Sequence, residues 1–308
     1  MIVPLDQEAR VVVVMLTLDQ CDKTLACLES LAALGDPPFH VLVWDNGSRD
    51  GSEQRVKAAR PEVLFHYSDR NLGVASGRNA GARLALSTLQ PEFLLFLDND
   101  MLVTEGFVRA LVDALDADPR VGQAQAKLRL MDDPQRLNDG GGCKIRFWRG
   151  LTIPVGFREL DEGQCDVPTD CVACGGAMIV RSRLFEELDG FDATFDPFGP
   201  EDLDFSLRLQ KAGHRARYVP LAMAYHEVSS TFEGGAYTEV YAQNKTRNWL
   251  VFMLRHAPWY EKLVFVLFSV PMLALRVLIR EGRAGNLGAV RGLARGLFDF
   301  LRQRARRG

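Results

Sequence analysis

Short apolar runs alternate with helical patterns through the first hundred residues, and this alternation restricts the possible folds more than any other feature of the chain. The runs have the length of buried strands and occupy residues 11–16, 39–44, 63–66 and 93–97. Helical patterns lie between them, at residues 24–31, 52–60 and 75–89. Strands and helices that alternate at this spacing predict an α/β fold with a parallel, doubly wound sheet.

Polar residues follow the ends of these predicted strands. Thr17, Asp45 and Asp98 each come directly after an apolar run. Ligands of doubly wound sheets bind beyond the carboxyl ends of the strands. We therefore expect these side chains to lie on one rim that faces a ligand.

Two carboxylates at the end of the fourth run indicate a cation site. Asp98 and Asp100 are separated by one residue after the run at 93–97. Carboxylate oxygens are the ligands that hard divalent cations prefer. Asp is also a common turn and cap residue, so the alternative is that the two residues only cap the next helix.

Arg78 lies among glycines near the start of the third predicted helix. Gly73, Gly77 and Gly81 are four residues apart, which differs from the dinucleotide-binding pattern and favours close helix packing. Arg78 at the ligand rim is suited to stack on a base or to pair with a phosphate.

Five motifs occur together in one order and spacing. They are Thr17 after the valine run, residues 43–52 (VWDNGSRDGS), residues 71–73 (NLG), residues 77–81 (GRNAG) and residues 98–100 (DND). In this arrangement, over about residues 10–255, the chain resembles the family 2 glycosyltransferases. These are inverting enzymes of the GT-A fold. The most similar subgroup contains rhamnosyltransferase-like proteins of bacterial surface polysaccharide assembly.

The resemblance implies roles for matching residues at the donor end. Thr17, Asp45 and Arg78 would line the nucleotide base, and Asp98 would reach the ribose and the metal. Asp100 would bind the Mg²⁺ or Mn²⁺ ion that bridges the donor diphosphate. Asn46, in the same nucleotide-binding motif, stands where many members have a second Asp. Residues 18–19 (LD) replace an aromatic residue and Asn, so both departures concern the identity of the base.

An acidic cluster at residues 201–204 is the second candidate for chemistry. Glu201, Asp202 and Asp204 follow Pro200 at a predicted helix start, where the helix dipole stabilises carboxylates. The cluster can be simply an acidic first turn. The resemblance instead implies that Asp202 is the base that deprotonates the acceptor hydroxyl, with Glu201 orienting the acceptor or the base. Arg208 would face this pair or the solvent.

His226 follows two short strand-like runs, at residues 217–219 and 222–225. A lone His is often a structural residue. In some relatives a His at the matching place completes the metal site, so we predict the metal ligands Asp98, Asp100 and His226.

The region between the two halves carries few periodic signals. Residues 132–163 are rich in Gly, Asp, Arg and aromatic residues and predict loops or a small irregular sheet with acceptor contacts. A strand is expected at residues 174–181, entered through glycines; the family resemblance implies that these small residues let the acceptor approach the backbone. Cys143, Cys165, Cys171 and Cys174 have irregular spacing, which favours buried thiols over a zinc site.

The charge of the chain is concentrated at its C-terminal end. Residues 276–308 hold nine Arg, Glu281 and Asp299, so this segment has a net charge of +7. Because the whole chain has a net charge of −3, residues 1–275 have a net charge of −10. The apolar stretch at 263–279 has 17 residues and contains Pro271 and Arg276, so no full membrane span is expected. Apolar residues at helical spacing between the later arginines predict a basic amphipathic helix that lies in an anionic membrane interface. The alternative is packing on its own domain or on a second subunit of a homo-oligomer.

Composition excludes several classes of protein. With 308 residues, 47% hydrophobic and 25% charged, the chain is neither disordered nor fibrous. The basic segment lacks interleaved Tyr, Trp or Lys and matches no nucleic-acid-binding motif, so no nucleic acid is expected. No signal peptide is evident, which predicts reduced cysteines and a cytoplasmic protein, peripheral on the inner face of the cytoplasmic membrane.

We therefore predict a metal-dependent inverting hexosyl- or deoxyhexosyltransferase that moves a sugar from a nucleotide-diphosphate donor to a glycan or lipid-linked glycan hydroxyl. Its GT-A domain would span 1–255, with a nucleotide-sugar half at 1–130 and an acceptor half at 131–255, followed by helices at 256–308. One alternative is an inactive sugar-nucleotide-binding scaffold subunit, which would need no base at residues 201–202. The other is a nucleotidyltransferase, which should carry a Gly-rich basic signature that residues 17–21 lack.

Overall fold

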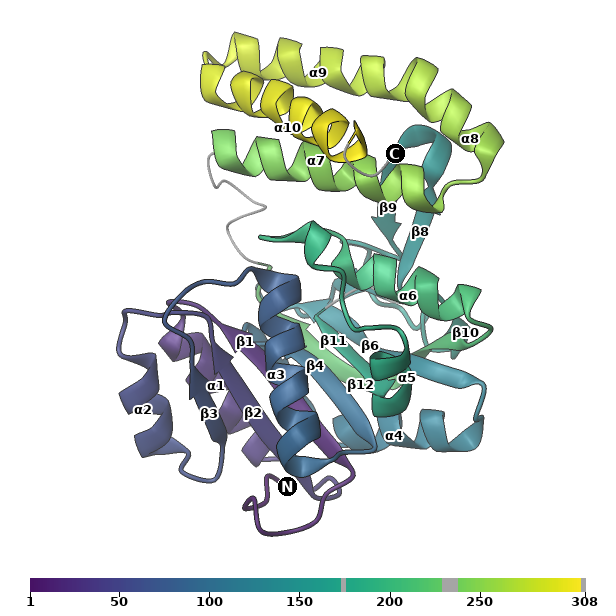
Figure 1. Ribbon diagram of the computed structural model, residues 1–308. Coiled ribbons are helices and arrows are strands. Elements are labelled where there is room, and N and C mark those ends of the chain that lie inside the picture. Colours follow the sequence, from purple (N-terminus) through teal and green to yellow (C-terminus); the bar gives the residue numbers. More distant parts are fainter. Residues whose placement is uncertain (173–175, 229–237, 306–308) are drawn as a thin grey trace.

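The computed structural model describes residues 1–172, 176–228 and 238–305. Figure 1 shows a twisted sheet covered by helices on both faces, with a separate layer of helices above it. The strands are β1 (Val11–Thr17), β2 (Phe39–Asp45), β3 (Leu64–Tyr67), β4 (Phe93–Asp98), β5 (Met101–Val103), β6 (Val121–Leu130), β7 (Leu137–Asp139), β8 (Cys143–Arg146), β9 (Leu151–Pro154), β10 (Thr169–Asp170), β11 (Ala177–Arg181) and β12 (Arg215–His226).

The helices fall into two groups. Those of the sheet domain are α1 (Cys21–Ala32), α2 (Ser52–Ala59), α3 (Val74–Leu89), α4 (Phe107–Ala117), α5 (Ser182–Glu187) and α6 (Glu201–Lys211), with the 3-10 turns η1 (Phe147–Arg149) and η2 (Ala193–Phe195). The upper layer contains α7 (Glu239–His256), α8 (Trp259–Val264), the π-helical turn η3 (Phe265–Ser269), α9 (Val270–Arg283) and α10 (Leu287–Ala305).

The main sheet has the strand order β10-β12-β6-β11-β4-β1-β2-β3, with β5 on β12 and β7 on β6. Strands β1 to β4 pair in parallel, as the alternation of strands and helices predicts. Strand β11 runs antiparallel between β4 and β6. This insertion brings the second half of the chain against the central strand β4. The predicted mostly parallel sheet is confirmed, with this reversal in the middle.

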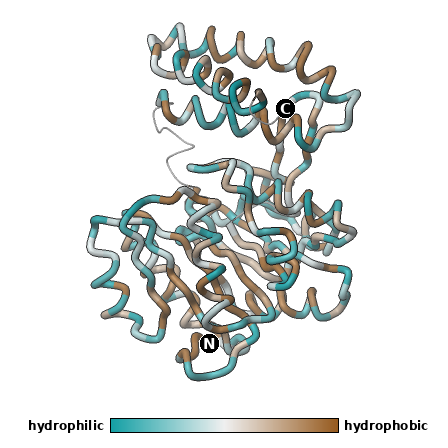
Figure 2. The backbone as a smooth tube through the Cα atoms, in the orientation of Figure 1, coloured by the Kyte–Doolittle hydropathy of each residue, from teal (hydrophilic) through white to brown (hydrophobic). Residues whose placement is uncertain are grey.

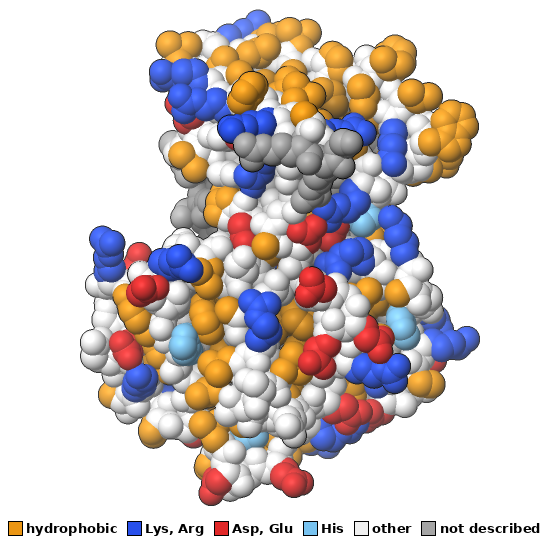
Figure 3. Space-filling view, viewed as in Figure 1, with side chains coloured by type: hydrophobic (Ala, Val, Ile, Leu, Met, Phe, Trp, Pro, Cys, Tyr) orange, Lys and Arg blue, Asp and Glu red, His pale blue; other side chains and the backbone are white. Residues whose placement is uncertain are grey.

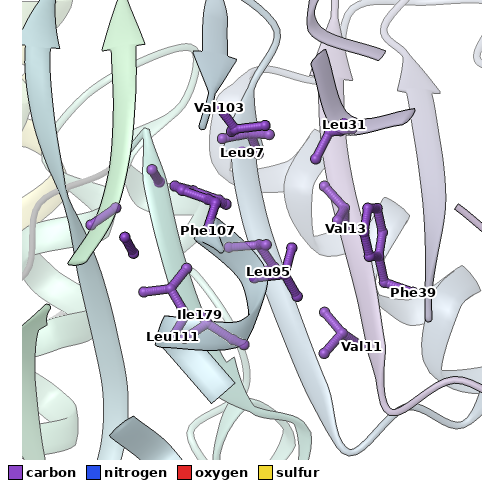
Figure 4. Packing of buried hydrophobic residues seen from close by; sticks show 14 of the residues in the cluster. Val11, Val13, Leu31, Phe39, Leu95, Leu97, Val103, Phe107, Leu111 and Ile179 are labelled. Atoms are coloured by element: carbon purple, nitrogen blue, oxygen red, sulfur yellow. The ribbon is translucent and has the colours of Figure 1, made fainter. Parts of the chain in front are cut away.

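The core lies on both faces of β1 and β4. Val11 and Val13 contact one hydrophobic cluster, while Val12 and Val14 contact the other. Figure 4 shows the first cluster, where Phe107 and Leu111 of α4 pack toward Leu95 and Ile179 of the sheet. Since successive strand residues point to opposite faces, a strand that is apolar throughout must be covered on both sides.

Some boundaries differ from the sequence expectations. The two strand-like runs at 217–219 and 222–225 belong to one long strand, β12, which has a register shift between Val219 and Met223. The region at 132–163 forms β7 and the β8–β9 hairpin, the small irregular sheet that its composition predicts. Cys174 and Gly175 of the expected glycine-rich strand entry lie outside the described residues.

The apolar C-terminal stretch lies in a longer helical segment than its 17 residues indicate. Helices α8 and α9 join through η3 into one segment of 25 residues, Trp259–Arg283, which by length and composition alone could cross a membrane. Pro271 does not end it. The π-helical turn ends two residues before this proline, which lies in the first turn of α9, where a missing backbone N–H is tolerated.

Helix α10 packs against α7 through a row of small residues. Ala289, Gly292 and Gly296 are buried there. A Cβ atom on Gly292 would lie 2.2 Å from the Glu239 carbonyl oxygen, and one on Gly296 would lie 2.3 Å from that of Gln243. The two backbones therefore approach closely, and one face of α10 is covered by its own chain, as the packing alternative stated.

Candidate active site

Asp100 and His226 meet where two strands end side by side. Strand β5 follows Asp100 and pairs antiparallel with the end of β12, with Met101 opposite His226. This register places His226 Nε2 3.5 Å from Asp100 Oδ1. That oxygen is buried and accepts no hydrogen bond of normal geometry from a described residue. A buried carboxylate oxygen with free lone pairs, next to an imidazole nitrogen, is chemically suited to a divalent cation.

Asn138, at the centre of β7, orients His226 from the other side. His226 Nδ1 lies 2.9 Å from Asn138 Oδ1, and an amide oxygen can only accept, so Nδ1 carries the proton and Nε2 faces Asp100. Burial lowers the pKa of His226, but the Asp100 carboxylate outweighs it, so the net pKa is raised. In a metal-ligating histidine, one ring nitrogen usually binds the metal while the other donates its proton to a neighbouring oxygen. His226 has this arrangement, with Asn138 as the acceptor.

Asp98 is engaged by an arginine that also holds the second acidic cluster. Arg78 Nη2 donates to Asp98 Oδ1 at 2.5 Å, and its Nη1 donates to Glu201 Oε1 at 2.9 Å. Burial lowers the pKa of Arg78, yet the charges of Asp98 and Glu201 raise it overall. One buried guanidinium thus joins the end of β4 to the start of α6, which lie far apart in the chain.

Glu201 and Asp202 differ in environment although they are neighbours. Glu201 is 4% exposed, and its Oε2 accepts no hydrogen bond from a described residue. Burial and the negative charge of Asp202, opposed by Arg78, raise the pKa of Glu201 to about 8. Asp202 is half-buried, and its Oδ1 accepts a hydrogen bond from the Leu203 amide at 2.7 Å. Glu201 is therefore harder to ionise than an exposed glutamate.

Asp204 is engaged by two arginines and a histidine rather than by Arg78. It accepts hydrogen bonds from Arg208 Nε at 2.7 Å, Arg255 Nη1 at 2.8 Å and His256 Nε2 at 2.7 Å. Burial alone would raise the pKa of Asp204, but these partners lower it to about 2. The expectation for Arg208 was wrong, because it faces neither the Glu201–Asp202 pair nor open solvent. Arg208 and α7 instead hold α6 in place through Asp204.

The predicted nucleotide-binding residues lie around the ends of β1 and β2. Thr17 Oγ1 is 2.8 Å from Thr24 Oγ1, and Asn99 Nδ2 donates to both hydroxyls. Asp45 Oδ1 accepts from the Gly47 and Ser48 amides, while its Oδ2 is buried and accepts no hydrogen bond from a described residue. This oxygen is available to a ligand at the strand end.

Asn46 joins two loops of the same rim. Its amide donates to Asn71 Oδ1 at 2.8 Å and to the Gly73 carbonyl, and its oxygen accepts from the Leu72 amide. These bonds use both ends of the side chain to hold the residues before α3. The contacts of Asn46 therefore fix the loop before α3.

Comparison with known proteins gives the family. A family model described as Glycosyl transferase family 2 matches residues 12–188, more than half of the chain. The chain belongs to this family. A second model, described as the N-terminal domain of galactosyltransferase, matches residues 159–231. The chain is thus a glycosyltransferase, as predicted.

Curated relatives of this family 2 glycosyltransferase include two bacterial enzymes. The N-acetylglucosaminyl-diphospho-decaprenol L-rhamnosyltransferase of Mycobacterium tuberculosis is 26% identical over 252 residues, which cover 76% of this chain and 81% of the relative. An N-acetylglucosaminyltransferase of Bradyrhizobium diazoefficiens is 30% identical over 217 residues, 65% of this chain and 41% of the relative. The first relative supports the predicted rhamnosyltransferase-like subgroup.

Solved structures share the fold at low sequence identity. A mannosyltransferase from Pyrobaculum calidifontis, in complex with GDP-Man and Mn²⁺, aligns with a TM-score of 0.59 at 16% identity and covers 97% of this chain and 88% of that one. S. aureus TarS 1–349, in complex with UDP-GlcNAc, aligns with a TM-score of 0.60 at 16% identity. The alignment covers 95% of this chain and 80% of the TarS chain. The GT-A fold of this glycosyltransferase is thereby confirmed.

The structure brings most of the predicted site residues of this glycosyltransferase to one rim, but not into a closed metal site. Within residues 1–172, 176–228 and 238–305, no group of three His, Cys, Asp or Glu side chains is close enough to hold a cation by itself. Asp98 is paired with Arg78, which leaves Asp100 and His226 as the adjacent pair. Among the described residues, Cys143, Cys165 and Cys171 also form no such group. They are half-buried rather than the buried thiols expected, and they line a cavity of about 650 Å³.

Two positioning residues were missed by the sequence reasoning. Asn138 fixes His226 from 88 positions away, and Asp196 accepts hydrogen bonds from the Ala75 and Ser76 amides at the start of α3. Asn138 lies in a region without periodic signals, and Asp196 lies about 120 positions from its partners. No local pattern marks such contacts, so only an alignment of homologues would have indicated them.

Proposed function

We propose that this family 2 glycosyltransferase moves a hexosyl or deoxyhexosyl group from a nucleoside diphosphate donor, with inversion, to a hydroxyl of a lipid-linked glycan. The bridge that Arg78 makes between Asp98 and Glu201 carries this proposal. It places the start of α6, with its acidic pair, against the strand end where a diphosphate would bind. The proposed base and the proposed donor site are therefore adjacent.

In this scheme Asp202 is the general base. A hydroxyl of the acceptor loses its proton to Asp202 as its oxygen bonds to the anomeric carbon, and the bond from that carbon to the diphosphate oxygen breaks. One direct displacement inverts the configuration. Burial and the charge of Asp202 raise the pKa of Glu201, so the two neighbours differ in their readiness to ionise and would take different roles. Glu201 would orient the acceptor hydroxyl or Asp202.

The donor would lie across the ends of β1, β2 and β4. Thr17 and Asp45 would contact the base, assisted by Asn46 and Arg78, and Asp98 would contact the ribose. Asp100 and His226, with Asp98, would hold Mg²⁺ or Mn²⁺ together with oxygens of the diphosphate. When bound, this cation would neutralise the charge of the departing diphosphate. A donor set of carboxylate and imidazole favours Mn²⁺ over Mg²⁺, which prefers oxygen ligands.

Relatives support the choice of substrates. The name of the mycobacterial relative combines a deoxyhexose with a polyprenyl-diphosphate acceptor, which supports an acceptor of that class here. The two solved neighbours hold GDP-linked and UDP-linked sugars, so the base stays open. We assign residues 1–130 to the donor, 131–255 to the acceptor and 256–308 to the inner face of the cytoplasmic membrane. The acidic pair at Glu201 and Asp202 argues against an inactive scaffold subunit.

The test compares the wild-type chain with Asp202→Asn. The wild type is incubated with UDP-, dTDP- and GDP-sugars, Mn²⁺ and a polyprenyl-diphosphate-linked sugar acceptor, and the product anomer is determined by NMR. Loss of a general base should lower transfer by roughly 10²- to 10⁴-fold. Nucleotide binding, followed as a rise in melting temperature, should be unchanged in the variant. A variant that binds nucleotide and transfers at the wild-type rate would show that Asp202 is not the base.

A further inference from the structure

The outer face of the helical segment Trp259–Arg283 is apolar and exposed. Its inward residues, Phe265 and Ser269, are buried, whereas Leu267 is 63% exposed, Phe268 68% and Leu275 57%. Only 11% of its most apolar stretch of 18 residues is buried. The brown stretch of α9 in Figure 2 and the orange atoms at the top of Figure 3 show this face. A patch of this kind is rare on a protein that meets only water.

Cationic side chains border this apolar face. At about 100° per residue, Arg276, Arg280 and Arg283 fall on one flank of the face that Leu275 and Ile279 occupy. Arg291 and Arg295 of α10 form ion pairs with Glu239, yet their side chains remain 67% and 63% exposed. Apolar residues beside exposed arginines complement the acyl chains and phosphate groups of an anionic lipid surface.

A second chain segment contributes to the same surface. The tip of the β8–β9 hairpin contacts α8 and η3, where the Trp148 amide donates to Glu261 Oε2 at 2.9 Å and Ser269 Oγ donates to the Trp148 carbonyl. Trp148 is 46% exposed, and Trp259 and Tyr260 are 73% and 56% exposed. Trp and Tyr are typical of the headgroup level of a membrane. They gather here at one end of the helix.

The packing of α10 argues against a membrane span. Twenty-five residues at about 1.5 Å each give about 37 Å, enough to cross a bilayer core of about 30 Å. However, α9 packs on α10, which packs along α7. A crossing of α8–α9 would draw Arg291, Arg295 and Asp299 of α10 into the hydrocarbon, which is costly. Lying flat, the segment buries its apolar face and leaves these charges in water.

We propose that the segment Trp259–Arg283 and the hairpin tip Phe147–Arg149 lie flat in the headgroup region of an anionic membrane. We call this the lipid-facing surface; its anchors are Trp148, Trp259, Leu267, Phe268, Leu275 and Ile279. The inference deepens the proposed function, since a lipid-linked acceptor explains why the surface is present, but binding to vesicles does not depend on transfer.

The lipid-facing surface has a short covalent route to the site. Residues 138–150 run from Asn138, which contacts His226, through β8 to the hairpin tip. Trp249 of α7 adds a hydrogen bond from Nε1 to the Gly150 carbonyl at 2.8 Å. Docking through this surface would therefore hold the site at a fixed height above the membrane.

Vesicle flotation of the full chain tests the surface. Wild type should float with vesicles of phosphatidylglycerol and phosphatidylethanolamine, and binding should fall at least tenfold on pure phosphatidylcholine or in 1 M salt. Phe268→Glu should lower binding to the anionic vesicles at least tenfold. Leu221→Glu is the matched control, because Leu221 is 80% exposed on β12, outside the helical layer, and its variant should bind like wild type. Equal loss in both variants, or no flotation of wild type, would overturn the proposal.

Alkaline carbonate separates a flat helix from a spanning one. A flat, interfacial chain should be released from the vesicles, while retention in the pellet would contradict the flat orientation. Nucleotide binding to Phe268→Glu, read from the melting temperature, should equal that of wild type. If no nucleotide binds wild type although it floats, the proposed function fails and the lipid-facing surface stands.

Discussion

Two carboxyl groups in the first turn of α6 have pKa values that their surroundings shift in opposite directions. Glu201 is buried beside Arg78 with a pKa raised to about 8, whereas Asp204 lies among Arg208, Arg255 and His256 with a pKa lowered to about 2. Both are fully covered carboxyl groups of one helix turn. The number of cations that the fold places against each determines the difference.

Glu201→Gln should change the pH dependence of stability. A raised carboxyl pKa means that the folded state binds the proton more tightly, so the contribution of Glu201 to stability falls as the pH rises from its ordinary pKa of 4.5 to about 8. The free energy of unfolding of the variant should therefore rise relative to that of wild type between pH 5 and pH 8. The difference should reach up to a few kcal/mol, since one pKa unit corresponds to about 1.4 kcal/mol. Urea unfolding at both pH values measures this. Glu53→Gln, on the exposed face of α2, should show no such gain; an equal gain there would refute the assignment.

Asp204→Asn should lower the free energy of unfolding by about 3 kcal/mol, because it removes a buried carboxylate from two half-buried arginines. Since the folded pKa of Asp204 is depressed, its contribution is present above its ordinary pKa of 3.8 and is lost as the pH falls toward about 2. Asp22→Asn breaks an ion pair with Arg55 in which the Asp side chain is 86% exposed, so it should cost less than about 1 kcal/mol. Similar losses for the two variants would contradict this account.

At the scale of elements, α7 connects the helical layer to the site. Asn248 donates to the carbonyls of Phe195 and Phe198, and Arg247 donates to that of Asp196, whose side chain holds the start of α3. Arg255 reaches Asp192 and Asp204. The helix that packs against α10 therefore also braces α6, which carries the proposed base, and α3, which carries Arg78.

The contact between α10 and α7 depends on glycine. Gly292→Ala would place a Cβ 2.2 Å from the Glu239 carbonyl oxygen and 2.8 Å from the Ala242 Cβ, so it should destabilise the chain by about 1 to 3 kcal/mol. Gly282→Ala, in α9, meets nothing within 4 Å and should be neutral or stabilising, because Ala is the better helix former. Thermal unfolding of the two variants makes the comparison. A melting temperature for Gly292→Ala at or above that of Gly282→Ala would rule out close packing.

At the scale of the whole molecule, the proposed cation site is assembled from β4, β7 and β12. The pairing of β5 with β12 brings Asp100 to His226, and the pairing of β7 with β6 brings Asn138 to the same place. The proposed site is thus a product of the sheet, with Asp98 and Asp100 from the first half of the chain and His226 from the second. A bound diphosphate would complete its coordination.

Removal of the metal should remove donor binding. Excess EDTA should abolish the rise in melting temperature that a nucleoside diphosphate produces, and Mn²⁺ should restore it. His226→Ala should weaken Mn²⁺-dependent nucleotide binding by roughly 10- to 100-fold. His214→Ala, directly before β12 and at the opposite end of that strand from His226, is a control that should keep the wild-type response. Nucleotide binding that EDTA leaves unchanged would exclude the cation from the scheme.

Local chemistry made much of this protein predictable. The apolar runs of β1, β2 and β4 and the Asp residues at their ends follow from strand periodicity and turn preference, which act over a few residues. The order of the motifs then indicated the family. The position of Asp98 at a strand end could be predicted from its own apolar run. Its place on the same rim as Asp45 followed because parallel strands end at one edge of the sheet.

Contacts between distant residues were decided by the tertiary structure alone. The antiparallel insertion of β11, the two carboxylates bound by Arg78, the Asn138 partner of His226 and the role of Arg208 each join segments that are far apart or face an unpredicted neighbour. The helical segment that contains Pro271 likewise continues through a π-helical turn that no residue preference indicates. Sequence fixes which groups are available, whereas packing of the whole chain selects the partners, because burial and pairing energies depend on every surrounding element.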